Sequence, residues 1–173
     1  MRYKFQKIAN FLLRSREQWR HLPLVRGWWL LNALVNWVLT TRMRVFGDPR
    51  RIHVDQSVVL CNTLFNTVLG DIYIGEWTFC GQDVSILTGT HDAHLKGALR
   101  LRHTCHGNYD IRIGNGVWLC SNCTILGPCE IGDDAVIAAG AVITPRTVVP
   151  PRSIWGGVPA KQIGEIAAED RTP

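Results

Sequence analysis

Apolar residues recur at every sixth position over the C-terminal part of the chain. Counted from residue 113, the sequence divides into the hexads IGNGVW, LCSNCT, ILGPCE, IGDDAV, IAAGAV, ITPRTV and VPPRSI. The first position of every hexad is aliphatic, and the fifth holds a small or medium-sized residue. An α-helix repeats every 3.6 residues and a simple strand every two, so neither alone explains this period. A fixed internal period indicates a repeat architecture.

The period predicts an all-β solenoid, in which short strands are joined by turns and successive coils stack about 4.8 Å apart. First-position side chains are expected to point inward, onto the coil below. The fifth position needs a small side chain near a corner, which gives Cys123 and Cys129 a packing role. The same six-residue spacing of apolar positions is present upstream at Ile74, Cys80 and Ile86, and more weakly at Val54 and Leu60.

The rhythm lapses between Leu87 and Ile111, over a stretch that begins TGTHDAH. A long excursion of this kind in a compact domain tends to be functional. Histidine can take and give a proton near neutral pH, which makes His91 a candidate for acid–base chemistry. Such a side chain can act as a general base toward a poor nucleophile such as a hydroxyl. His103 and His106 are expected to be ordinary loop residues.

Charge divides the chain into two unequal parts. Residues 1–50 hold ten Lys/Arg against two Asp/Glu, whereas residues 51–173 hold nine against twelve. The basic residues are spread singly, so no nucleic-acid partner is expected. The apolar stretch 28–39 is shorter than the roughly 20 residues that cross a bilayer. Residues 1–44 are therefore expected either to lie at a lipid surface or, the favoured reading, to pack against protein.

No cleavable signal peptide opens the sequence, so we expect a cytoplasmic protein, at the membrane surface if its N-terminal segment binds lipid. The six cysteines are then expected to be free thiols. Cys120 and Cys123 form a single CxxC, which without a second pair is a weak metal signal, and no metal is expected.

The hexads, the stretch IGNGVWLCSNCTIL and the closing GGVPAK resemble the hexapeptide-repeat acyltransferases, above all the galactoside and maltose O-acetyltransferases and their polysaccharide-modifying relatives. The resemblance covers about residues 52–166. It implies a left-handed parallel β-helix and a homotrimer with active sites between subunits. The organisation expected from it is an N-terminal helical segment (1–50), a β-helix acyltransferase domain (51–166) and a C-terminal tail (167–173).

The resemblance also assigns roles to single residues. His91 matches the histidine that acts as general base, while the role of His94 stays open. The implied binding residues for the acetyl-CoA donor are Ser121, Ala139, Thr144, Arg146 and Lys161, and those for the acceptor are Asn62 and Trp118. The alternative for the first three is ordinary turn filling, and for Trp118 a subunit contact. Two departures weaken the implied phosphate contacts: Pro145 follows Thr144 where relatives carry lysine, and Gly164 stands where another basic residue is usual.

The activity implied is acetyl-CoA-dependent O-acetylation of a sugar hydroxyl, on a polysaccharide or glycan precursor. Two alternatives remain open: N-acylation of an amino sugar or nucleotide sugar, and a non-catalytic trimeric scaffold. The γ-class carbonic anhydrases share this fold but need a pair of histidines on a later coil. The sequence has no histidine after His106, which argues against that metal site.

Overall fold

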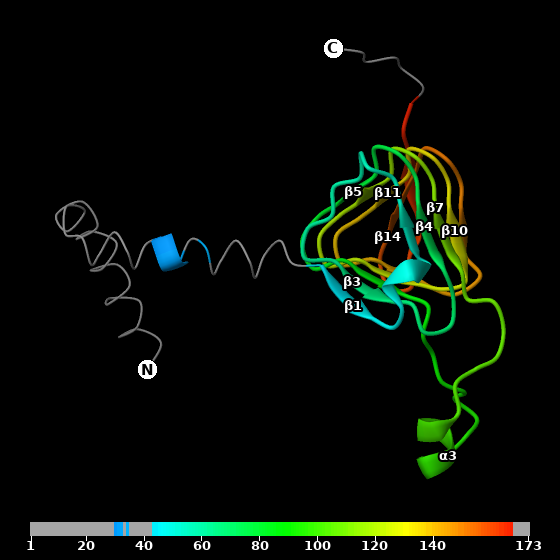
Figure 1. The fold of residues 1–173 in the computed structure, drawn as a ribbon. Coiled ribbons are helices and arrows are strands. Elements are labelled where there is room, and N and C mark those ends of the chain that lie inside the picture. The colour runs from blue at the N-terminus through cyan, green and yellow to red at the C-terminus, as the bar shows by residue number, and fades with distance from the viewer. Residues whose placement is uncertain (1–29, 33, 35–42, 168–173) are drawn as a thin grey trace, which may run out of the picture. The chain divides into compact units, whose positions relative to one another are not determined.

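The computed structural model describes residues 30–32, 34 and 43–167 (Figure 1). The chain divides into two compact units, Met1–Leu39 and Thr40–Pro173. In the first unit, residues 30–32 and 34 are helical. Most of the predicted N-terminal helical segment (1–50) lies outside the described residues. Among those described, no helix has the length and apolar character needed to cross a bilayer.

Three five-stranded sheets form the walls of the second unit, which is a three-sided prism (Figure 1). Sheet A contains β1 (Arg44–Phe46), β3 (Leu64–Asn66), β6 (Ser85–Leu87), β9 (Thr124–Leu126) and β12 (Val142–Ile143). Sheet B contains β2 (Ile52–Val54), β4 (Ile72–Ile74), β7 (Ile111–Ile113), β10 (Cys129–Ile131) and β13 (Val148–Val149). Sheet C contains β5 (Phe79–Cys80), β8 (Trp118–Leu119), β11 (Val136–Ile137), β14 (Ser153–Gly156) and β15 (Lys161–Glu165). The remaining elements are the 3-10 helix η1 (Pro49–Arg51) and the helix α3 (Gly97–Arg102).

The chain passes repeatedly from sheet A to sheet B to sheet C, and the turns between them form the A–B, B–C and C–A corners. Neighbouring strands in each sheet run parallel, with one exception: β15 folds back antiparallel to β14 and closes the end of sheet C. Sheet A begins already at Arg44, ahead of the boundary expected at residue 51. The prediction of a left-handed parallel β-helix is confirmed.

Inward-pointing apolar side chains, most of them aliphatic, fill the prism in three vertical columns. In sheet A, for example, Phe65, Ile86, Ile125 and Ile143 occupy matching positions on successive strands. All first-position residues of the later hexads are at most 4% exposed: Ile113, Leu119, Ile125, Ile131, Ile137, Ile143 and Val149. The prediction that the first position of each hexad points inward is therefore confirmed.

A backbone conformation with positive φ recurs at the fourth position of the hexad, where the chain turns a corner. The residues found there are Trp77, Asp83, Gly116, Asn122, Asp134, Gly140, Arg146 and Arg152. Glycine adopts this conformation without steric cost, and Asn and Asp tolerate it better than most other residues. The residue types at the corners are therefore determined by the turn conformation, and those in the walls by packing.

The buried cysteines fill space at the fifth position, as predicted. Cys123 and Cys129 are buried beside the corners, and all six cysteines are free. Burial raises the pKa of both thiols to about 12, and that of Cys80 to about 11. These thiols are consequently neutral core groups at physiological pH.

The raised thiol pKa values predict a loss of stability at alkaline pH. A thiol in the unfolded chain ionises near pH 8.5, whereas the buried thiol stays protonated up to its raised folded pKa. Its contribution to the free energy of unfolding is therefore complete below about pH 8.5. That contribution is lost as the pH rises toward the folded pKa, at about 1.4 kcal/mol per pH unit for each thiol. Cys123→Ala removes one of these thiols, so between about pH 9 and 11 the unfolding free energy should fall less steeply with pH. The difference in slope should correspond to one proton. Alanine stands at the equivalent positions 135 and 141, so it fits the site. Urea unfolding in the presence of reductant measures the slope, and the half-buried Cys61→Ala is the control; equal slopes for wild type and Cys123→Ala would contradict the expectation.

Candidate active site

The excursion between β6 and β7 leaves the prism at the A–B corner and forms a separate lobe, residues 88–110 (Figure 1). It contains α3 and an isolated antiparallel bridge between His91 and Thr104. The bridge closes the base of the lobe, because it joins the outgoing limb to the returning one. The predicted lapse of the hexads thus corresponds to an insertion at one corner of one coil.

His91 lies at this base with an exposed side chain. Its Nδ1 atom is 3.2 Å from the backbone oxygen of His103. A carbonyl oxygen can only accept a hydrogen bond, so the contact assigns the ring proton of neutral His91 to Nδ1. The lone pair on Nε2 then remains available as a base.

Arg100, on α3, fastens the helix to the outgoing limb of the lobe. Its Nε donates a hydrogen bond of 2.6 Å to the carbonyl of Leu95, and its Nη2 donates one of 2.9 Å to the carbonyl of Ala93. The N–H of His103 in turn donates to the carbonyl of Leu99 at the end of α3. Arg100 is therefore linked through α3 to the carbonyl that holds the His91 ring.

A cavity of about 550 Å³ separates the lobe from the A–B corner of the last coils. This volume is within the usual range for small-molecule sites. Its lining residues include His91, His94, His106 and Arg146. Tyr109 also lines it, and a hydrogen bond with Cys105 raises the pKa of its hydroxyl, which keeps Tyr109 neutral and able to donate. The cavity thus combines one candidate base with hydrogen-bond donors and a cation.

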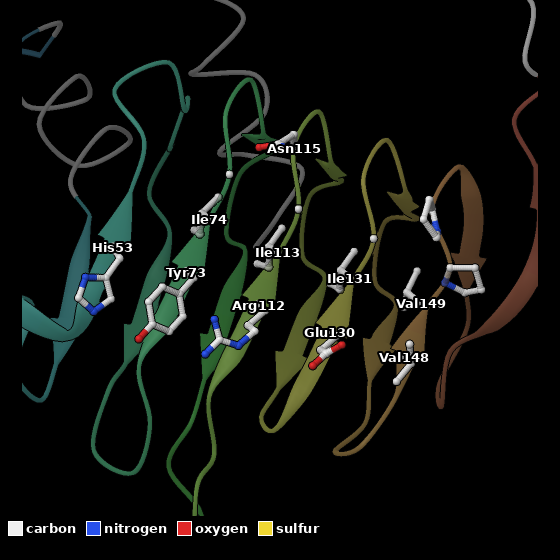
Figure 2. Close-up of a pocket in the computed structure, with 15 residues that line it drawn as sticks. His53, Tyr73, Ile74, Arg112, Ile113, Asn115, Glu130, Ile131, Val148 and Val149 are labelled. Atoms are coloured by element: carbon white, nitrogen blue, oxygen red, sulfur yellow. The ribbon is translucent and has the colours of Figure 1, made fainter.

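A groove of about 610 Å³ runs across the outer face of sheet B, and Figure 2 shows its lining side chains in a row from His53 to Val148. Tyr73 is stacked on His53 at a centroid distance of 4.6 Å, and the Arg112 guanidinium lies 4.4 Å from its ring centroid. Asp71 accepts hydrogen bonds from Arg51 and the His53 ring, which lower its pKa, with Arg51 the larger cause. A smaller hollow of about 230 Å³ lies between this groove and the lobe cavity. Arg112, Glu130 and Val148 line both the hollow and the groove.

The structure distributes the predicted binding residues over two corners and one wall. Thr144 and Arg146 follow β12 at the A–B corner, and Arg146 lines the same cavity as His91. Ser121 and Ala139 follow β8 and β11 at the C–A corner, while Lys161 pairs with Gly156 near the same corner. Trp118 lies on the outer face of sheet C, stacked against Phe79 at 5.7 Å. One chain therefore does not bring the whole predicted set together.

Asn62 also lies at the C–A corner, where its side chain exchanges hydrogen bonds with Asp83. Sequence reasoning missed Asn66, whose amide lies beside Gly89 on the outgoing limb of the lobe that leads to His91. A Cβ atom built on Gly89 would lie 2.6 Å from its Nδ2, so the absent side chain at Gly89 leaves room for this amide two residues before His91. The hexad pattern does not identify Asn66 because its coil is longer than the later ones. The paired Phe65 and Ile86 are 21 residues apart, whereas Ile125 and Ile143 are 18 apart.

Comparison with known proteins matches residues 110–145 to the family described as bacterial transferase hexapeptide (six repeats). The galactoside O-acetyltransferase of Escherichia coli (strain K12) is 33% identical over 129 residues, which are 73% of this chain and 60% of that protein. Among solved structures, a maltose O-acetyltransferase from Clostridium difficile 630 is 28% identical with a TM-score of 0.63, over 73% of this chain and 64% of that one. A galactoside acetyltransferase in complex with coenzyme A is 26% identical with a TM-score of 0.53, over 78% and 66%.

These findings confirm the predicted resemblance to the hexapeptide-repeat acyltransferases. The match to the family covers the coils from the end of the lobe to the last residues after β12. The chain spans about 60% of the length of the galactoside O-acetyltransferase that it matches, and 64% of the maltose O-acetyltransferase.

The hydrogen bonds of Arg100 predict that it stabilises the lobe without contributing to the prism. Arg100→Ala removes both contacts to the outgoing limb, so the backbone amides of residues 93–104 should exchange hydrogen roughly tenfold faster. Exchange in the sheets should not change. Arg102→Ala, on the same short helix, is the matched control and should leave lobe exchange near the wild-type rate. Equal exchange in the Arg100→Ala and Arg102→Ala proteins would contradict the assigned role.

Proposed function

We propose that this chain, whose central coils carry the bacterial transferase hexapeptide repeat, is an acetyl-CoA-dependent O-acetyltransferase acting on a sugar hydroxyl of a polysaccharide or glycan precursor. The observation that carries the proposal is the setting of His91. It borders a ligand-sized cavity beside the repeat, with Nδ1 engaged by a carbonyl and Nε2 available as a base. The O-acetyltransferases among the relatives supply the reaction class.

In this mechanism, Nε2 of His91 accepts the proton of the acceptor hydroxyl while the oxygen attacks the thioester carbonyl. A C–O ester bond forms and the C–S bond breaks. His91 then returns the proton to the departing thiolate, so charge and protons balance without a covalent acyl-enzyme. The buried thiols of Cys80, Cys123 and Cys129 have raised pKa values and take no part as nucleophiles.

The donor would lie along the C–A corner, where Ser121 and Ala139 occupy equivalent places on successive coils. The N–H of Gly140 donates to the carbonyl of Ser121 at 3.1 Å, which ties the two turns together. Ala139 is exposed and small, so an extended arm can approach the backbone there. Arg146 and Lys161 are both exposed and supply charge-assisted donors for phosphates.

Because the base and the donor-binding turns lie on different corners, we infer that the active site forms between copies of the chain. His91 and Arg146 are at the A–B corner, whereas Ser121 and Ala139 are on the far side of sheet A. In a closed ring, packing sheet B of one copy against sheet C of the next sets the A–B corner of the first beside the C–A corner of the second. A three-sided prism suits a ring of three, and such a head-to-tail interface closes by rotation. This arrangement is the proposed homotrimer.

The two alternatives for residues 1–44, packing against protein or contact with a membrane surface, stay predictions, as does the place of the protein in the cell. N-acylation of an amino sugar or nucleotide sugar is the alternative reaction, because the same base would serve an amine nucleophile.

The role of His91 predicts that His91→Ala loses acetyl transfer by a factor of about 10² or more, because the variant lacks the proposed general base that removes the acceptor proton. Mass spectrometry would detect products after incubation with acetyl-CoA and a panel of sugars, amino sugars and nucleotide sugars. His103→Ala is the matched control, since it keeps the backbone carbonyl that orients His91 and should keep most of the activity.

The same assay separates the candidate functions. Transfer to hydroxyls alone supports the proposal, and transfer only to amines identifies an N-acyltransferase. Undiminished activity of His91→Ala would exclude this histidine as the base. A wild-type protein that neither transfers acetyl groups nor binds acetyl-CoA would be the non-catalytic scaffold.

The shared site predicts complementation between two inactive variants. His91→Ala lacks the base, whereas Ala139→Trp blocks the donor side with a bulky group at an exposed position. In trimers reassembled from equal amounts of the two, about one site in four combines an intact A–B corner with an intact C–A corner. Activity should therefore return to about a quarter of the wild-type value per subunit. Inactive mixed trimers would show that both halves of the site come from one chain.

A further inference from the structure

Trp77 combines a strained backbone with an exposed indole at the B–C corner. Its φ of 59° is in the left-handed region, and it is the only aromatic residue there in the part of the chain that the structure describes. Its side chain is 72% exposed. The other fourth-position residues at this corner are Gly116, Asp134 and Arg152.

Neither feature of Trp77 is explained by the packing of the prism. A bulky side chain is unfavourable at positive φ, where glycine or asparagine would serve the turn. The N–H of Trp77 donates to Oγ of Ser57 at 2.8 Å, which holds the backbone in place but does not use the ring. An indole kept at such a position indicates that it gains contacts elsewhere.

The surface beside Trp77 is apolar and extends over the outer face of sheet C. Val59 forms a bridge to Phe79, and Phe79 is stacked on Trp118. All three are among the exposed large hydrophobic residues. We call Trp77 and these three residues the sheet C apolar face. Exposed apolar patches of this kind mark interaction sites.

We infer that Trp77 is the anchor through which copies of this chain associate, with its indole buried against a second copy at the B–C corner. The inference rests on the proposed function in one respect, because it assumes the ring in which the A–B corner of one copy lies beside the C–A corner of the next. When those two corners meet at the rim of the ring, the B–C corner of every copy is innermost. The Trp77 side chains of all copies then converge on the symmetry axis.

The two walls that meet in this ring are complementary. The sheet C apolar face presents aromatic rings, whereas the groove on sheet B presents Arg112, Glu130 and the edge of Tyr73 (Figure 2). An arginine over aromatic rings gives a favourable cation–π contact, and Phe79 and Trp118 offer such rings. Trp, Tyr and Arg are the residue types that dominate binding energy at the centre of interfaces. A second copy therefore fits both walls and the corner between them.

The test exploits opposite effects on folding and association. Trp77→Gly removes the indole but suits the positive φ, so the individual chain should fold as well as the wild type or better. Its association should weaken by at least about 10²-fold, as expected for a central tryptophan. Light scattering coupled to size exclusion, over a range of protein concentrations, measures the mass of the full-length protein, and far-UV circular dichroism follows folding.

Asp134→Gly is the matched control, because it makes the same backbone change at the same corner without removing an apolar group, and it should keep the wild-type mass. Trp77→Asn gives a second substitution that suits positive φ and should dissociate like Trp77→Gly. A folded Trp77→Gly protein of wild-type mass, or a wild type that is monomeric at tens of micromolar, would overturn the inference. Because mass is read without an activity assay, an inactive wild-type trimer that Trp77→Gly dissociates would refute the proposed function and support Trp77 as the anchor.

Discussion

The stacking of one coil on the next is the constraint on which the rest of the structure depends. A single coil cannot cover its own apolar residues, so each inward aliphatic column is continuous only when the strands keep register. The columns in all three sheets consist of matched positions, such as Ile74, Ile113 and Ile131 in sheet B. This requirement fixes the walls and leaves the corners as the places where the sequence can vary.

The corners therefore hold most of the candidate chemistry. His91 and Arg146 lie at one corner and Ser121 and Ala139 at another, because the wall positions between them are committed to pairing and packing. A prism places its corners far apart, so a site that needs two of them has to be completed by a second copy. The separation of functions within one chain and its proposed self-association are consequences of the same geometry.

The sequence was sufficient to predict the fold because its period is enforced by burial at every coil, and the inward positions from Ile113 to Val149 are buried as expected. The excursion and the position of His91 within it were also predictable, because a lapse is obvious against a strict period, whereas the role of His91 as a base stays a proposal. Asn66 was missed because the longer A–B corner of its coil shifts the register by three residues. The carbonyl partner of His91 was not predictable, since it depends on how the lobe folds back through α3.

The position of the lobe has a consequence for how such a protein can change. The strands on either side of it pair with their neighbours as if it were absent: β6 pairs with β9, and β7 with both β4 and β10. The lobe is thus an insertion whose length and composition are not coupled to the register of the core. Substitutions within it can alter the shape of the cavity around His91 while the scaffold keeps its stability. New acceptor preferences can then arise through substitutions within this lobe of about two dozen residues, while the fold stays unchanged.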